Sequence, residues 1–359
     1  MSEWIIKPSY KLDLACFCNL FYKADMVIDK HREAYGIFKD RIDMRNDLVE
    51  FSKGMLAEGY MIGVAMASLL DLIDYNGGDI DEICSIMDDE STRPILDEFI
   101  TKSGYTEDLR EKVLALLPIM SDMLHYVHSM GFFEYWHDEC IDHIKKKCDE
   151  FTLLADRYPV VSTVNDILGI HGDRKPPVTL YVCRFSAPYG IGLTNAFISD
   201  VRWNFEDTVA IALHELIHPP FKRGTIREMA DGIWKDGFFR KAKGLLEASS
   251  GYGKPEDFLE ENLVEGTHIY LSEEMGVEKN PLKYLAEHDS GSHVISAILY
   301  DALKKGYRDK AGSIEEVVWK LIEEGPLKPG KIEENYLRIY NEAGLLGLCP
   351  KPLTEGDKQ

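Results

Sequence analysis

One short stretch of the chain, residues 171–204, differs in pattern from everything around it. It holds two runs of β-branched and aromatic residues, VTLYVCRF at 178–185 and NAFISDV at 195–201, with the turn-rich SAPYGIG between them. Such runs are typical of strands, and the turn signals between them predict a hairpin. Because the rest of the chain has helical periodicity, we expect an α+β fold that is predominantly helical, with a small mixed or antiparallel sheet packed on the histidine-bearing helix that follows.

The helical pattern divides the chain into three parts around this stretch. Apolar residues recur at intervals of three and four before it, which predicts a helical N-terminal domain or subdomain over residues 1–168. We expect a separate core domain, which contains these strands, over 169–310. The last part, 311–359, is expected to form helices that pack on that core. No internal repeat or low-complexity segment is present.

Composition excludes several classes of partner. The 359 residues are 45% hydrophobic, which is enough for a globular core, and the net charge of −21 leaves no basic surface for nucleic acid. The longest apolar stretch, 60–73, contains Asp71 and is shorter than the roughly 20 residues of a membrane span. Seven cysteines without dense spacing indicate a reducing compartment. With no signal peptide visible, we expect a cytoplasmic protein with no membrane partner.

The segment ALHELIHPP contains the strongest chemical signal in the chain. His214 and His218 are four residues apart, so on a helix both imidazoles leave the same face and can bind one metal ion. Glu215 is offset by one position, where its carboxylate can hold a water molecule beside that ion. Pro219 and Pro220 cannot continue the helix, so we expect it to end at the second histidine. The alternative is two hydrogen-bonded core histidines.

A catalytic zinc ion needs a third protein ligand, because such sites have three ligands and one exchangeable water. The HExxHxxGxxH pattern is excluded, since the chain has Phe221 and Gly224 where that pattern requires glycine and histidine. An acidic amphipathic segment follows downstream, EDFLEENLVEGTHIYLSEE at 256–274. It can supply a glutamate ligand from a second helix.

This combination resembles the gluzincin metallopeptidases, among which the thermolysin-like enzymes are best known. In that family, HExxH is followed by a helix with a ligand glutamate and a second carboxylate four residues later, which orients a ligand histidine. Glu261 and Glu265 in ENLVE match this spacing, although the family often has aspartate at the second position. Spacing alone leaves Glu260 and Glu265 as alternative ligands.

Two further segments resemble the same family. NAFIS, which begins with Asn195 and Ala196, is similar to the edge strand with which thermolysin-like enzymes pair with the substrate backbone; an ordinary half-buried strand is the alternative. HDSGSHVIS at 288–296 is similar to the segment that presents a histidine to the developing oxyanion. His293 would then be the donor and Asp289 its orienting partner, at a spacing one residue tighter than the family pattern. His268, Tyr270 and Tyr300 are alternative donors.

The resemblance implies a zinc-dependent metallopeptidase, with one Zn²⁺ per chain and a peptide or protein substrate. His214, His218 and Glu261 would hold the ion, Glu265 would orient a ligand, and Glu215 would be the general base. A catalytically silent zinc-binding or regulatory protein has the same residues and stays an alternative. A metal-free helical scaffold is the third interpretation.

Overall fold

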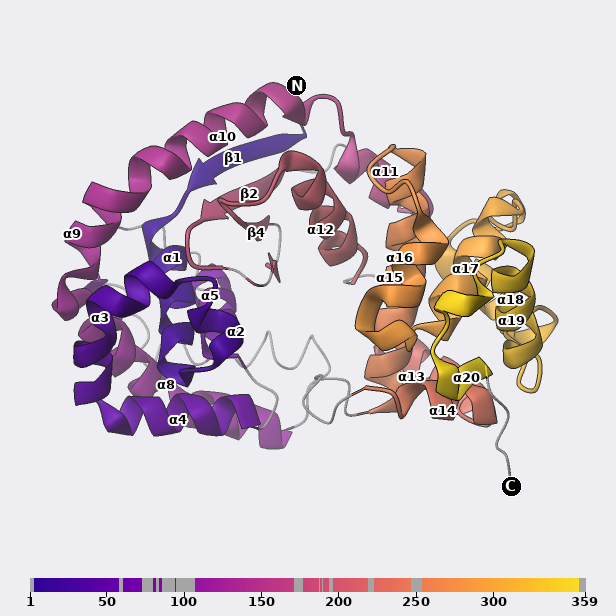
Figure 1. The fold of residues 1–359 in the computed structure, drawn as a ribbon, viewed down its shortest axis with the longest axis horizontal. Helices are drawn as coiled ribbons and strands as arrows, with labels where there is room; N and C mark the ends of the chain where they lie inside the picture. The colour runs from indigo at the N-terminus through magenta and orange to yellow at the C-terminus, as the bar shows by residue number, and fades with distance from the viewer. Residues whose placement is uncertain are drawn as a thin grey trace. The chain divides into compact units, whose positions relative to one another are not determined.

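The computed structural model describes most of the chain. The described residues are 3–57, 61–72, 80–81, 84–85, 94, 107–170, 177–186, 188, 190–193, 196–218, 223–246 and 254–354. Asn195, Pro219 and Pro220 lie outside them. The described chain is predominantly helical and has one small mixed sheet (Figure 1), so the predicted α+β class is confirmed.

The chain forms two compact units that alternate along the sequence. The first contains Met1–Arg157 and Pro177–Phe205, and the second contains Tyr158–Pro176 and Glu206–Gln359. This division differs from the predicted boundaries after residues 168 and 310. The strands expected in the core belong with the N-terminal helices because an N-terminal strand pairs with them.

The sheet belongs to the first unit and has the strand order β1-β2-β4-β3. Its strands are β1 (Trp4–Pro8), β2 (Val178–Cys183), β3 (Ile191–Gly192) and β4 (Ala196–Asp200). β1 and β4 both run parallel to β2, whereas β3 runs antiparallel to β4. The predicted hairpin between β2 and β4 is therefore wrong. Because these two strands are parallel, the connection must return the chain to the end at which β2 begins. The turn residues of this connection lead into β3, which pairs with β4.

Helices surround this sheet within the first unit. Helix α10 runs along β1 (Figure 1) and also contacts β2, which α1 contacts as well. The helices are α1 (Tyr10–Phe17), α2 (Asp25–Ile28), α3 (Arg32–Met44), α4 (Asn46–Ala57), α5 (Ile62–Leu72), α8 (Glu107–Val127), α9 (Phe133–Tyr135) and α10 (Ile141–Ala155), with π-helical turns at His128–Phe132 and Trp136–Cys140.

A buried carboxylate joins three segments of the first unit. Asp13 on α1 is fully buried, and its Oδ1 accepts hydrogen bonds from the backbone N–H groups of Arg184 and Phe185, at 2.6 and 2.9 Å. Its Oδ2 accepts a third from Nε1 of Trp136, at 2.8 Å. These contacts tie the end of β2 to α1 and to the helix before α10.

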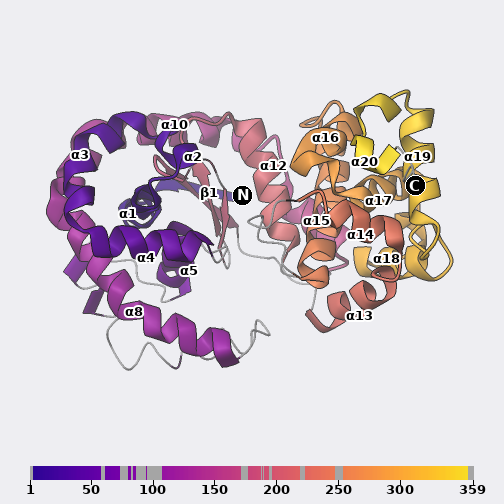
Figure 2. The same ribbon diagram turned by 60° about the horizontal axis from the view of Figure 1, so that its bottom comes forward.

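The second unit is built from helices around α15 (Figure 2), which packs against α13, α16 and α17. Its other members surround these. The helices are α11 (Val160–Ile167), α12 (Phe205–Ile217), α13 (Arg223–Ile233), α14 (Gly237–Lys243), α15 (Pro255–Glu274), α16 (Pro281–Glu287), α17 (Val294–Lys304), α18 (Ile314–Glu323), α19 (Ile332–Glu342) and α20 (Lys351–Thr354).

Two residues of α15 set its close packing against α17. A Cβ atom on Gly266 would lie 2.7 Å from the carbonyl oxygen of Ser296 and 2.9 Å from its Cα, so only glycine fits without a shift. The buried Asn262 accepts a hydrogen bond from the N–H of Ile295 at 3.0 Å, and its carbonyl oxygen accepts one from the Ser296 hydroxyl at 2.8 Å. Asn262 therefore satisfies an otherwise unpaired donor at the start of α17.

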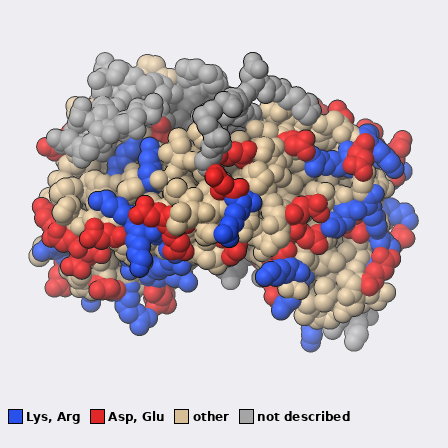
Figure 3. Space-filling model, turned by 90° about the horizontal axis from the view of Figure 1, so that it is seen from above, with Lys and Arg blue, Asp and Glu red and all other residues tan. Residues whose placement is uncertain are grey.

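The surface carries both signs of charge. On the face shown in Figure 3, Lys and Arg side chains are interspersed with Asp and Glu side chains, without a continuous basic area among the described residues. None of the described helices combines the length and the apolar character needed to cross a membrane.

Candidate metal centre

The HELIH segment occupies the C-terminal end of α12. His214 and His218 are one turn apart and half-buried, whereas Leu213 and Ile217 beside them are fully buried and hold the helix in the core. The helix ends at Ile217, one residue before His218, which agrees with the predicted stop. The two imidazoles thus lie at the end of a packed helix rather than on a free surface.

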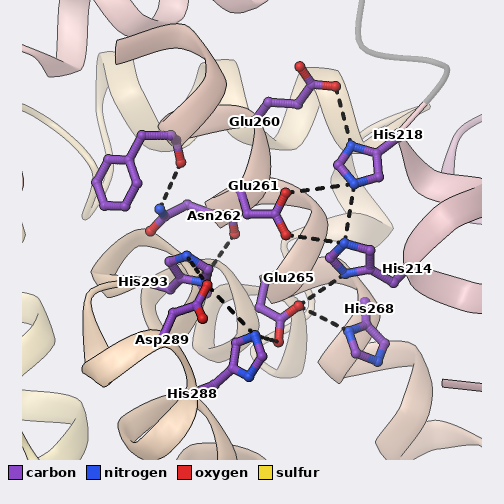
Figure 4. A network of polar contacts seen from close by, with 12 residues as sticks. His214, His218, Glu260, Glu261, Asn262, Glu265, His268, His288, Asp289 and His293 are labelled. Carbon is purple, nitrogen blue, oxygen red and sulfur yellow. Dashed lines mark hydrogen bonds and ion pairs between the residues drawn. The ribbon is translucent and has the colours of Figure 1, made fainter. Parts of the chain in front are cut away.

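Glu261 of α15 faces both histidines. Its Oε1 lies 3.1 Å from Nε2 of His214, and its Oε2 lies 3.7 Å from Nε2 of His218. The two Nε2 atoms are 3.2 Å apart. Figure 4 shows the carboxylate and the two rings pointing toward one another. Atoms of three residues, each a good metal ligand, therefore converge on one point.

The separations fit a tetrahedral zinc ion. With zinc–ligand bonds of about 2.0 to 2.1 Å, adjacent ligand atoms lie about 3.3 Å apart. The 3.2 Å between the two Nε2 atoms and the 3.1 Å from Nε2 of His214 to Oε1 of Glu261 are close to that value, and the 3.7 Å from Nε2 of His218 is to the other oxygen, Oε2. Two imidazole nitrogens and one carboxylate oxygen also form a donor set that zinc accepts. His214, His218 and Glu261 are thus suited to hold such an ion.

Each histidine also has a carboxylate on its other ring nitrogen. Nδ1 of His214 lies 3.1 Å from Oε2 of Glu265, which is buried, and Nδ1 of His218 lies 3.4 Å from Oε1 of Glu260. A proton on Nδ1 directed at a carboxylate leaves the lone pair of Nε2 for a metal. The structure thereby gives the three glutamates different positions: Glu261 faces both Nε2 atoms, while Glu265 and Glu260 each face one Nδ1.

The carboxylates keep a negative charge in this buried setting. Burial alone would raise the pKa of Glu261, but its hydrogen bond and charge interactions with His214 and the charge of His218 lower it to about 2. Burial would also lower the pKa of His214, yet Glu261 and Glu265 raise it well above the usual value. A proton on His214 therefore supplies positive charge where a metal cation would otherwise do so.

Glu215 is placed differently from the three other glutamates. It follows His214 on α12, is half-buried, and makes no hydrogen bond or ion pair with any described residue. Its carboxylate is therefore not consumed by a structural contact. This is the condition that a general base must meet before substrate binds.

The chain matches no protein-family model, no curated protein and no solved structure. The resemblance to the gluzincins therefore depends on the spacing and geometry of the residues described above.

The segment that follows α16 brings His293 and Asp289 together. His293 is buried directly before α17, and its Nε2 lies 3.5 Å from Oδ2 of Asp289. Of the alternative donors, Tyr300 donates a hydrogen bond to Glu273 at 2.9 Å, and Tyr270 is half-buried on α15. The Asp289–His293 pairing that the resemblance implies is therefore present, although its role in catalysis stays a prediction.

The substrate strand expected at NAFIS is not an edge strand. β3 pairs with β4 at Phe197 and Ile198, and the carbonyl oxygen of Ala196 accepts a hydrogen bond from the N–H of Leu193 at 2.8 Å. On its other side, β4 pairs with β2. The backbone groups of Ala196 are thus engaged within the sheet, and Asn195 lies outside the described residues.

Three residues near Glu265 add to the site beyond the sequence-based prediction. Nδ1 of His268 lies 3.2 Å from Oε2 of Glu265, and Nε2 of His288 lies 4.0 Å from Oε1. Tyr284 stacks on His288, and burial together with the charge of Glu265 raises its pKa. His268 could have been found, because it is three residues after Glu265 on one helix face. His288 and Tyr284 have no comparable signal in the sequence.

Proposed function

We propose that the protein is a zinc-dependent metallopeptidase with the metal held by His214, His218 and Glu261. The convergence of Nε2 of both histidines on the Glu261 carboxylate carries this proposal. When bound, zinc would supply Lewis acidity, which activates a water molecule and polarises a substrate carbonyl. The substrate class is peptides or proteins.

The remaining steps depend on side chains of this chain. The Glu215 carboxylate would accept a proton from the attacking water and return it to the leaving nitrogen. His293 would donate a hydrogen bond to the oxygen on which negative charge develops, from the ring nitrogen that does not face Asp289. Glu265 and Glu260 would hold the two ligand imidazoles in the orientation that directs Nε2 to the metal.

A cytoplasmic location is part of the proposal. The seven cysteines are all buried and free, which suits a reducing compartment. A catalytically silent zinc protein would have the same ligands. The position of Glu215 favours catalysis over this alternative, because its half-buried carboxylate beside His214 has no hydrogen bond or ion pair with the described residues and is available to a water molecule.

Metal analysis of the purified full-length chain tests the first part of the proposal. After dialysis against metal-free buffer, we expect close to one zinc ion per chain. A His214→Ala variant should lose that ion, whereas His137→Ala, which changes an exposed histidine of the first unit, should keep it. Wild-type protein without metal after gentle preparation would contradict the proposal.

Hydrolysis of a peptide mixture, followed by mass spectrometry, tests the second part. Glu215→Gln should keep the zinc ion and slow cleavage by about 10² to 10⁴-fold, because the amide cannot accept the proton. Glu206→Gln is a matched control, since Glu206 is exposed at the start of the same helix. If wild-type protein binds zinc but cleaves nothing, the silent zinc protein is the better interpretation.

A further inference from the structure

A second group of metal-ligating side chains lies beside the proposed zinc ligands. It contains His288, Asp289 and His293, whose ligand atoms all lie within 4.8 Å of one another. Oδ2 of Asp289 is 3.5 Å from Nε2 of His293 and 3.9 Å from Nε2 of His288. These three residues come from the turn between α16 and α17 and share no atom with the first group.

Glu265 provides an independent observation at this place. Its side chain is 1% exposed, and its Oε2 is engaged by His214 and His268. Its Oε1 is buried and lies 4.0 Å from Nε2 of His288, and the side chain of Tyr284 also hydrogen-bonds to the Glu265 carboxylate. A buried carboxylate oxygen in such a position is costly unless it has a cationic or hydrogen-bonding partner.

The backbone also holds Asp289 toward the two imidazoles. Asp289 has a φ of 42°, in the left-handed region that few residues other than glycine adopt. Figure 4 shows Glu265 between this group and the pair formed by His214 and His268. The ligand atoms of His288, Asp289 and His293 thus lie together, and Oε1 of Glu265 lies beside His288.

We propose that His288, Asp289, His293 and Oε1 of Glu265 form a second divalent-cation site, selective for ions such as Zn²⁺ that accept mixed nitrogen and oxygen ligands. The imidazole donors favour zinc, cobalt or nickel over calcium or magnesium. The donor atoms lie within 4.8 Å of one another, farther apart than those of the first site, and must move closer by up to about 1.5 Å to reach the spacing of zinc ligands, so the second ion binds more weakly.

The second site also fixes the position of the proton on His293. A cation on Nε2 occupies the lone pair of that nitrogen and leaves the proton of the neutral imidazole on Nδ1. Glu265 links the two sites, because its Oε2 faces a ligand of the first ion and its Oε1 faces the second.

Zinc titration of the full-length, chelator-stripped protein tests the proposal. Isothermal titration calorimetry with Zn²⁺ should show two equivalents in the wild type, the second weaker than the first. A double variant, His288→Asn with Asp289→Asn, should bind one equivalent. Asparagine tolerates the left-handed backbone of residue 289 well, so the fold should be preserved. Circular dichroism and thermal melting check that it is.

Two matched variants, His214→Ala and His137→Ala, serve as controls for the same titration. His214→Ala should lose the tighter equivalent and keep the weaker one, and His137→Ala should keep both. Cobalt absorption spectra should show two components in the wild type and one in each depleted variant. A single equivalent in the wild type, or a second equivalent that persists in the double variant, would overturn the proposal.

These readouts are independent of peptide hydrolysis. Absence of cleavage with two bound ions would reject the peptidase and leave the second site intact. Cleavage with one bound ion, insensitive to substitution at 288 and 289, would reject the second site and leave the peptidase intact.

Discussion

Two buried carboxylates, one in each unit, have opposite electrostatic surroundings. Asp13 accepts three hydrogen bonds from neutral N–H groups, and burial, only partly offset by these bonds, raises its pKa to about 7. For Glu265, burial would raise the pKa, but the charge of His268 and the hydrogen bond with His214 lower it well below the usual value. Both side chains are at most 1% exposed.

The difference separates a structural role from a functional one. Neutral donors satisfy the oxygens of Asp13 and close the network, so nothing is left for a ligand. Glu265 keeps a full negative charge among imidazoles, which themselves can bind protons or metals. The kind of partner, rather than burial, therefore indicates which buried carboxylate belongs to a site.

The largest expected effect is a dependence of stability on pH that comes from Asp13. Its pKa is raised from 3.8 to about 7 on folding, so the native state binds more protons than the unfolded state between these values. Stability should be highest below pH 4 for this group and fall as the pH rises to 7, by on the order of 4 kcal/mol. Urea unfolding at pH 5 and pH 8 measures the change, with Asp13→Asn as control. Equal pH dependence in both proteins would show that Asp13 is ionised throughout.

The matched substitution in the second unit, Glu265→Gln, should act on metal binding. The substitution removes the negative charge of the Glu265 carboxylate, which faces Nδ1 of His214, and this weakens the imidazole as a ligand. We therefore expect zinc affinity to fall about 10 to 100-fold. Competition with a fluorescent chelator measures the affinity. Asp13→Asn should not change it. If both variants bind zinc equally well, the contrast between the two carboxylates has no functional meaning.

Gly266→Ala tests whether the packing of α15 maintains the site. The added methyl group would meet the backbone of Ser296, and we expect a loss of about 1 to 3 kcal/mol together with weaker zinc binding. Gly54→Ala in α4 is the matched change in the first unit. Nothing lies within 4 Å of that position, so it should stabilise the helix by about 0.5 to 1 kcal/mol. A neutral result at Gly266 would show that α17 moves freely relative to α15.

The smallest effect is expected for Glu260→Gln. Its contact with His218 is longer, at 3.4 Å, and both side chains are partly exposed, so solvent screens the interaction. Zinc affinity should fall less than tenfold, below the effect of Glu265→Gln. The same chelator competition measures it. A larger loss than that of Glu265→Gln would identify Glu260 as a metal ligand.

Local periodicity was sufficient to predict the parts of the site that depend on one helix. The interval of four between His214 and His218 fixes their common face, and the same interval relates Glu261 to Glu265. The neighbouring prolines predicted where α12 ends. The choice between Glu260 and Glu261 could not be made from the sequence, because adjacent helix positions differ by about 100° and only the tertiary fold places one of them against both Nε2 atoms.

Contacts between residues far apart in the sequence were the second feature that could not be predicted. β1 is a five-residue run with a lysine and a proline, and it becomes a strand because it pairs with residues 178–182, far along the chain. β2 and β4 also pair in parallel, which no local signal indicates. His288 and Tyr284 join Glu265 through the turn after α16, and tertiary packing alone brings them there.

The alternation of the two units has a consequence for synthesis on the ribosome. Residues 158–176 are made before the strands β2 to β4 but belong to the unit completed by residues 206–359. Within that unit, Asp166 pairs with Arg308, and Gly169 is packed against Gly312. The nascent first unit can close its sheet once β4 emerges, whereas α11 must wait for the C-terminal helices. The unit that contains the proposed metal ligands is therefore the last to be completed.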